Sequence, residues 1–189
     1  MLLRESPPGG VMNDAVARIV VGHMGDPEEA KVGELLLDIG LELVGIHVPV
    51  SPDGDRYNNI GEVDLLFKHG DTAFIVEVSV QSKRGEKLKK FFTRFSETTT
   101  LDILKKRQTK ISNVHYFKRI YFDIEHNYNE KELSEAMTGI SNDGNHIVLK
   151  DEFGKLQEWV ESEKKRRVDS FLDIVSRKGN GPISFPQDA

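Results

Sequence analysis

Alternating apolar and polar residues mark two short strands near the middle of the chain. Every second residue is apolar along residues 62–68 and again along residues 73–79, and many of these are β-branched or aromatic. A period of two bounded by turn residues is typical of β-strands. Gly70 and Asp71, between the two segments, are favoured as a two-residue hairpin turn. The pattern therefore predicts a β-hairpin with Asp64 opposite Glu77.

The predicted hairpin has one apolar face and one face that carries carboxylates. Its register also sets Glu62 opposite Ser79, whereas the other face is wholly apolar and is expected to be buried. Directly opposed side chains have Cβ atoms roughly 4.5–5.5 Å apart, and like charges there are destabilising. Asp64 and Glu77 therefore need a compensating cation, and a divalent metal with oxygen ligands is the natural candidate. The alternative is a solvated face on which neither carboxylate binds a metal.

Apolar residues at helical and strand spacing place further elements on both sides of the hairpin. We expect helices over residues 11–24, 27–39, 86–107, 131–140 and 155–178, and strands over residues 41–50, 116–124 and 146–150. The second helix has the clearest ends, with Asp26 as its N-cap, Pro27 at its first position and Gly40 as its stop. Glu29 falls at the third position, where a capping-box side chain belongs. The order of elements predicts a mixed α/β fold, with an antiparallel hairpin leading into α/β crossovers.

Two of these helices contain a stretch that favours a break. Threonines at residues 98–100 interrupt the helix over residues 86–107, and residues 161–167 in the last helix contain no apolar side chain. The second stretch either projects into solvent or separates two helices.

Length and composition indicate one domain. The chain of 189 residues is expected to form a single domain over residues 1–178, with its core at residues 25–160 and a flexible tail over residues 179–189. No apolar run approaches the ~20 residues that span a bilayer, and the first residues lack a signal-peptide pattern. There is no cysteine, and the six histidines lack the spacing of helical zinc ligands. We therefore expect a cytoplasmic protein that makes no membrane contact.

Positive charge gathers directly after the hairpin. The segment from Lys83 to Lys110 contains ten basic and three acidic residues, a local charge of +7. The whole chain has a charge of −5, so the rest of the chain carries −12. Such a segment beside a carboxylate pair is suited to hold a phosphate backbone, and its alternative is a solvated helix face. Phe91, Phe92 and Phe95 lie among these lysines, and their helical spacing favours a place in the core over base stacking.

The sequence resembles the PD-(D/E)XK, or restriction-endonuclease-like, nucleases. Residues 29–40 resemble the first core helix of that family, in which a glutamate lies eleven residues before the terminal glycine. The run from Asp64 through twelve residues to Glu77-Val78-Ser79 is similar to the family's Asp…Glu-x-Lys signature on its second and third strands. The resemblance covers residues 25–160 and implies a mixed sheet with an αβββαβ core flanked by helices, here followed by an extra strand and a long helix.

The resemblance also implies a chemistry. Asp64 and Glu77 would bind Mg²⁺ or Mn²⁺, and Glu29 would approach the same cation directly or through water. The activity would be hydrolysis of DNA phosphodiester bonds by a water that the cation activates, as an endonuclease or exonuclease acting as a homodimer. Glu29 also has its capping role, and both roles are compatible. Glu62 is interpreted either as a neighbour that tunes the site or as a surface charge of the hairpin.

One position departs from the family pattern. Ser79 stands where the family has its signature lysine, and a serine can donate a hydrogen bond but supplies no positive charge. Gln81 and Lys83 continue the strand face of Glu77, and Lys87 or Lys90 of the next helix are within reach to replace the lysine. The basic residues expected to contact nucleic acid are Lys83, Arg84, Lys87, Lys90 and Arg94.

The missing lysine leaves three hypotheses open. The first is an active Mg²⁺- or Mn²⁺-dependent deoxyribonuclease. The second is a catalytically inactive module of the same fold that binds nucleic acid or mediates protein interactions. The third is a structural protein that uses its long C-terminal helix as a dimer arm.

Overall fold

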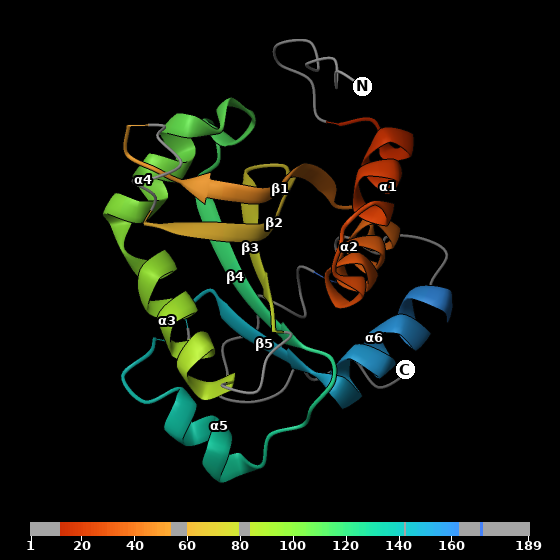
Figure 1. Cartoon of the computed structure of the whole chain (residues 1–189), viewed down its shortest axis with the longest axis vertical. Coiled ribbons are helices and arrows are strands. Elements are labelled where there is room, and N and C mark those ends of the chain that lie inside the picture. The colour runs from red at the N-terminus through yellow and green to blue at the C-terminus, as the bar shows by residue number, and fades with distance from the viewer. Residues whose placement is uncertain (1–11, 54–59, 80–83, 142, 163–170, 172–189) are drawn as a thin grey trace.

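A central sheet lies between two layers of helices (Figure 1). The computed structural model describes residues 12–53, 60–79, 84–141, 143–162 and 171. The helices are α1 (Asp14–Gly22), α2 (Pro27–Ile39), α3 (Arg84–Ser96), α4 (Thr98–Arg107), α5 (Glu130–Ala136) and α6 (Lys150–Ser162), with a 3₁₀ turn at Thr109–Ile111. The strands are β1 (Glu42–Val50), β2 (Gly61–His69), β3 (Thr72–Val78), β4 (Tyr116–Asp123) and β5 (Asn145–Leu149). The α/β class expected from the sequence is confirmed.

The sheet is mixed and follows the order of the chain. Strand order is β1-β2-β3-β4-β5, with β1, β2 and β3 antiparallel and β3, β4 and β5 parallel. Within the predicted hairpin, Leu65 pairs with Val76 and Phe67 with Phe74, which is the expected register. The turn uses Gly70 with a φ of 56°, a left-handed conformation that glycine adopts without a steric penalty.

Helices cover both faces of the hairpin, so the alternative of a fully solvated carboxylate face does not hold for Asp64 and Glu77. Helices α1, α2 and α6 cover one face of the sheet, and α3 and α4 cover the other (Figure 1). On the α3 side Leu66, Ile75 and Phe92 are fully buried. Asp64 and Glu77 share this second face, so the helices that pack on it also remove their carboxylates from bulk water.

The helices follow the sequence prediction with shifted ends. The break between α3 and α4 falls at Glu97, next to the threonines that predicted it. Helix α6 begins at Lys150 rather than Lys155 because β5 runs into it without a loop. Residues 179–189 and all but one residue of 163–178 lie outside the described part of the chain, so the predicted tail and the break in the last helix stay predictions. In the parts described, no helix has the length and apolarity to span a membrane.

The three phenylalanines of α3 belong to the core, as expected. Phe91 is 3% exposed, and Phe92 and Phe95 are fully buried. Phe91 and Phe92 both lie against the ring of Tyr121 on β4, with centroids 6.1 and 6.4 Å apart. This aromatic packing fixes α3 on the sheet and thereby sets the position of its other, polar side.

Candidate functional site

A row of three polar residues crosses the first three strands. The pairs Ile46–Leu65 and Val48–Val63 on either side of it set His47 opposite Asp64. The pair Leu65–Val76 sets Asp64 next to Glu77 in the same way. The row therefore runs from β1 through β2 to the carboxyl-terminal part of β3, and brings together two acids that the sequence predicted and a histidine that it did not.

Glu29 approaches this row from the first turn of α2. The Asp26 side chain caps the helix by accepting hydrogen bonds from the Glu28 and Glu29 amides at 2.9 and 3.1 Å. This cap sets the start of α2 and hence the place of Glu29, which is only 7% exposed. No bond from the Glu29 carboxylate back to the Asp26 amide completes a capping box in the described structure. Instead, its Oε2 atom is buried without a hydrogen-bond partner among the described groups.

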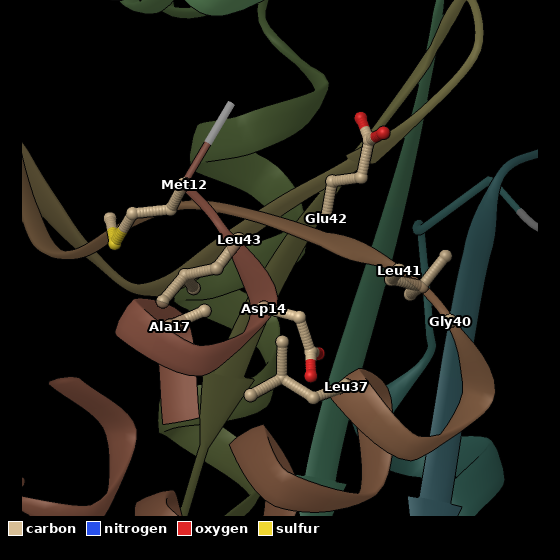
Figure 2. Close-up of a pocket in the computed structure, with 8 residues that line it drawn as sticks. All are labelled: Met12, Asp14, Ala17, Leu37, Gly40, Leu41, Glu42 and Leu43. Carbon is tan, nitrogen blue, oxygen red and sulfur yellow. The ribbon is translucent and has the colours of Figure 1, made fainter. Parts of the chain in front are cut away.

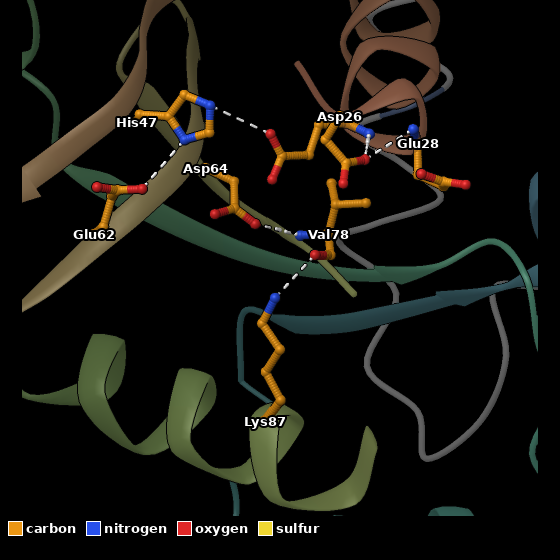
Figure 3. Close-up of polar contacts among 8 residues, drawn as sticks. Asp26, Glu28, His47, Glu62, Asp64, Val78 and Lys87 are labelled. Atoms are coloured by element: carbon orange, nitrogen blue, oxygen red, sulfur yellow. Dashed lines mark hydrogen bonds and ion pairs between the residues drawn. The ribbon is translucent and has the colours of Figure 1, made fainter. Parts of the chain in front are cut away.

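His47 lies between two carboxylates (Figure 3). Its Nε2 atom is 3.3 Å from Glu29 Oε2, and its Nδ1 atom is 3.1 Å from Glu62 Oε1. The ligand atoms of Glu29, His47 and Asp64 all lie within 4.8 Å of one another. Glu62 therefore neighbours the site through His47, although about half of its side chain is exposed.

Asp64 and Glu77 are each held by a group from another element. Asp64 Oδ2 accepts a 2.8 Å hydrogen bond from the Val78 amide of β3. The Glu77 side chain, 12% exposed, lies 3.1 Å from Lys87 Nζ. The same ammonium group donates to the Val78 carbonyl at 3.0 Å (Figure 3). Lys87 on α3 therefore brings a positive charge to the carboxylates.

The three carboxyl groups lie in an environment that disfavours their ionised forms. Burial, followed by repulsion from Asp64, raises the pKa of Glu29 and that of Glu77 to about 7. Burial also raises the pKa of Asp64, while the Val78 hydrogen bond and Lys87 act in the opposite direction. Because desolvation and like charge dominate, the nearby Lys87 and His47 do not compensate the cluster fully. Oxygen donors in this arrangement are suited to a divalent cation.

Ser79 does not take part in this cluster. It is 2% exposed, its amide donates to the Phe122 carbonyl at 2.8 Å, and its hydroxyl shares a hydrogen bond with Tyr121. The Ser79 side chain is therefore buried and hydrogen-bonded to β4. Of the residues considered as substitutes for the signature lysine, Gln81 and Lys83 lie outside the described residues. Lys87 is the considered residue whose ammonium group lies beside Glu77 in the described structure.

The other basic residues lie at different distances from the cluster. Arg94 on α3 packs over Gly61, and its charge acts to lower the pKa of Glu77. Lys90 is exposed on the same helix, and the described structure records no contact between it and the carboxylates. The side chain of Arg84 is not among the described groups.

A separate open pocket lies at the other end of α2 (Figure 2). Its lining includes Leu37 and Gly40 from the end of α2, Leu43 from β1 and Ala17 from α1, and Asp14 and Glu42 supply its carboxylates. At 1.5 Å per helical residue, Gly40 is about 16 Å along the helix from Glu29. This pocket is therefore distinct from the carboxylate cluster.

None of the protein-family models, curated proteins or solved structures compared with this chain matches it.

Proposed function

We propose that the protein is a metal-dependent nuclease that hydrolyses DNA phosphodiester bonds on a restriction-endonuclease-like fold. The observation that carries the proposal is that ligand atoms of Glu29 and Asp64 lie within 4.8 Å of each other, while Glu77 is close enough to Asp64 for repulsion to raise the Glu77 pKa. The Lys87 ammonium group lies 3.1 Å from Glu77. The element order α2-β1-β2-β3-α3-α4-β4 supports the proposal, because it is compatible with the αβββαβ core of that family if α4 is an additional helix.

The residues of the cluster fit a divalent cation. Asp64, Glu77 and Glu29 supply carboxylate oxygens, and the buried Oε2 atom of Glu29 has no hydrogen-bond donor among the described groups. A Mg²⁺ or Mn²⁺ ion bound there would lower the pKa of a water molecule and offset negative charge on the scissile phosphate.

Lys87 supplies the positive charge that Ser79 lacks. In the proposed mechanism its ammonium group holds Glu77 in place and stabilises negative charge that develops on the phosphate. It reaches the site from the helix rather than from the strand. Arg94 and the exposed Lys90, on the same helix, supply charge for the phosphate backbone.

The decisive experiment compares four proteins. Wild type, Glu77→Gln, Lys87→Met and Lys89→Met are incubated with linear, circular and single-stranded DNA in Mg²⁺, Mn²⁺ or EDTA. We expect cation-dependent cutting in wild type and Lys89→Met, and a loss of roughly 100-fold or more in the other two. Lys89→Met is the matched control because it removes the same charge from an exposed position of α3 that has no part in the proposed site. Equal cutting by wild type and Glu77→Gln would refute the assignment of this site.

DNA binding without cutting would favour the inactive module instead. The observation behind this second candidate is Ser79, whose buried hydroxyl is bonded to Tyr121 and brings no charge to the cluster. Salt-sensitive binding of DNA by wild type, with no cutting under any cation, would then identify nucleic-acid binding as the function.

A further inference from the structure

The imidazole of His47 is directed at the carboxylate cluster from β1. Its Nε2 atom is 3.3 Å from Glu29 Oε2, and a nitrogen of His47 lies within 4.8 Å of ligand atoms of both Glu29 and Asp64. Glu29 Oε2 is buried and accepts no hydrogen bond within the described structure. The His47 nitrogen and the carboxylate oxygens of Glu29 and Asp64 are close enough to one another to be ligands of one metal ion.

Glu62 holds the other side of the ring. Its Oε1 atom is 3.1 Å from His47 Nδ1. When Nδ1–H donates to this carboxylate, the lone pair of Nε2 is directed toward Glu29 and Asp64. Histidines that bind metals usually donate their second ring nitrogen to a carboxylate or a carbonyl in this way, which fixes the tautomer and the ring orientation. Glu62 therefore acts as a positioning residue for His47.

The backbone of His47 is strained. Its φ of 46° is left-handed, and it is the one non-glycine residue with positive φ in the described structure. The conformation costs on the order of 1–3 kcal/mol for such a residue and is found at ligand-binding sites, where surrounding structure holds it in place. A glycine or asparagine would adopt this φ more readily, so the strain points to a role for the side chain itself.

We propose that His47 is a nitrogen ligand of the cation bound by Glu29 and Asp64, and that it makes the site prefer Co²⁺ and Mn²⁺ over Mg²⁺. The inference rests on the proposed function, because it concerns the same cation site. Mg²⁺ selects oxygen ligands and retains its waters, whereas imidazole favours later first-row ions. Affinity then rises from Mn²⁺ to Co²⁺, following the general order for divalent ions.

The test measures binding rather than activity. Affinities of wild type, His47→Asn, His47→Gly and His115→Asn for Mg²⁺, Mn²⁺ and Co²⁺ are determined by calorimetry, and pulsed EPR of the Mn²⁺-loaded proteins detects a directly bound imidazole nitrogen. Asparagine and glycine both tolerate the left-handed backbone, so both variants are expected to fold. His115 is an exposed histidine next to the β2–β3 turn, where its amide donates to the Asp71 carbonyl at 2.8 Å.

We expect both His47 variants to lose the nitrogen signal and about 10-fold or more in Co²⁺ affinity, since even outer partners of metal ligands contribute 10–100-fold. Mg²⁺ affinity should change by less than about 3-fold, because Mg²⁺ does not depend on the imidazole. His115→Asn should behave as wild type. A nitrogen signal that persists without His47, or an unchanged order of cation affinities, would overturn this inference and leave the nuclease proposal intact. A wild-type protein that binds none of the three ions would overturn both.

Discussion

The buried carboxyl groups predict that the metal-free protein loses stability as the pH rises. The pKa of Glu77 is raised from 4.5 in the unfolded chain to about 7 in the folded protein, mainly by burial and then by Asp64. Between these values the folded state binds more protons than the unfolded state. The stabilisation is therefore fully present below about pH 4.5 and disappears as the pH passes 7. Glu29 has the same sign and window.

The magnitude follows from the size of the shift. One pKa unit corresponds to about 1.4 kcal/mol, so a rise from 4.5 to about 7 gives on the order of 3 kcal/mol for Glu77. Most of this, on the order of 2 kcal/mol, falls between pH 5 and pH 8. His146 has the opposite sign, because burial lowers its pKa to about 4, and a simple pH scan of wild type would mix the two effects.

The assay therefore compares wild type with Glu77→Gln, which cannot titrate at this position. Urea unfolding in EDTA, followed by circular dichroism and Trp159 fluorescence, is measured from pH 5 to pH 8. The variant should gain on the order of 2 kcal/mol relative to wild type over this range. Glu34→Gln, on the exposed side of α2, is the control and should show no such trend. A constant difference between wild type and Glu77→Gln would refute the argument that Glu77 is a buried, repelled carboxyl group.

Further predictions concern the residues that support the cluster. Asp26→Ala removes the acceptor that caps α2, so urea unfolding should show a loss of about 1 kcal/mol, and Mn²⁺ affinity should fall with it. Unchanged stability would contradict the cap. In Gly61→Ala the new Cβ would lie 2.7 Å from Arg94 Cδ, so Arg94 must move and salt-dependent DNA binding should weaken several-fold, as measured by fluorescence anisotropy. Unaltered binding would exclude Arg94 from the DNA surface. Ser79→Ala removes a buried hydroxyl bonded to Tyr121 and should cost about 1 kcal/mol by urea unfolding without changing Mn²⁺ affinity. A weaker affinity would place Ser79 in the site after all.

The hairpin was predictable because its register depends on local rules. A period of two and a two-residue turn at Gly70 fix which residues face each other, and the structure pairs Leu65 with Val76 as those rules require. The N-cap of α2 was predictable for the same reason, since Asp26 and Pro27 act within one turn. The positions of Asp64, Glu77 and Glu29 on their elements could therefore be predicted from local sequence rules.

The burial of the carboxylates was not predictable from the strand pattern. The polar side of the hairpin looked solvated because Asp64, Glu77 and Lys68 alternate with apolar residues. Burial there depends on α3 and α4 packing over the same face, which is a tertiary contact that strand periodicity does not encode.

His47 was missed because its signal lies in the backbone. A histidine in a strand is unremarkable in sequence, and neither its φ of 46° nor the register shift between Leu43 and Gly45 has a sequence pattern. Lys87 was one of several open choices, since four residues were within plausible reach of the site. Only the packing of α3 against Tyr121 distinguishes it from Lys90.

The position of Lys87 has a consequence for how the site depends on the fold. A lysine two residues after Glu77 would be fixed by the strand itself, whereas Lys87 is fixed by the docking of α3. Its ammonium group binds both Glu77 and the Val78 carbonyl, and Val78 in turn donates its amide to Asp64. The helix, the strand and both acids are therefore linked through one residue. Any change that shifts α3 on the sheet would move the positive charge away from the carboxylates and release the Glu77 side chain from its ion pair. The backbone positions of the three acids on α2, β2 and β3 do not depend on Lys87, so the charge can be lost while the acids remain on their elements.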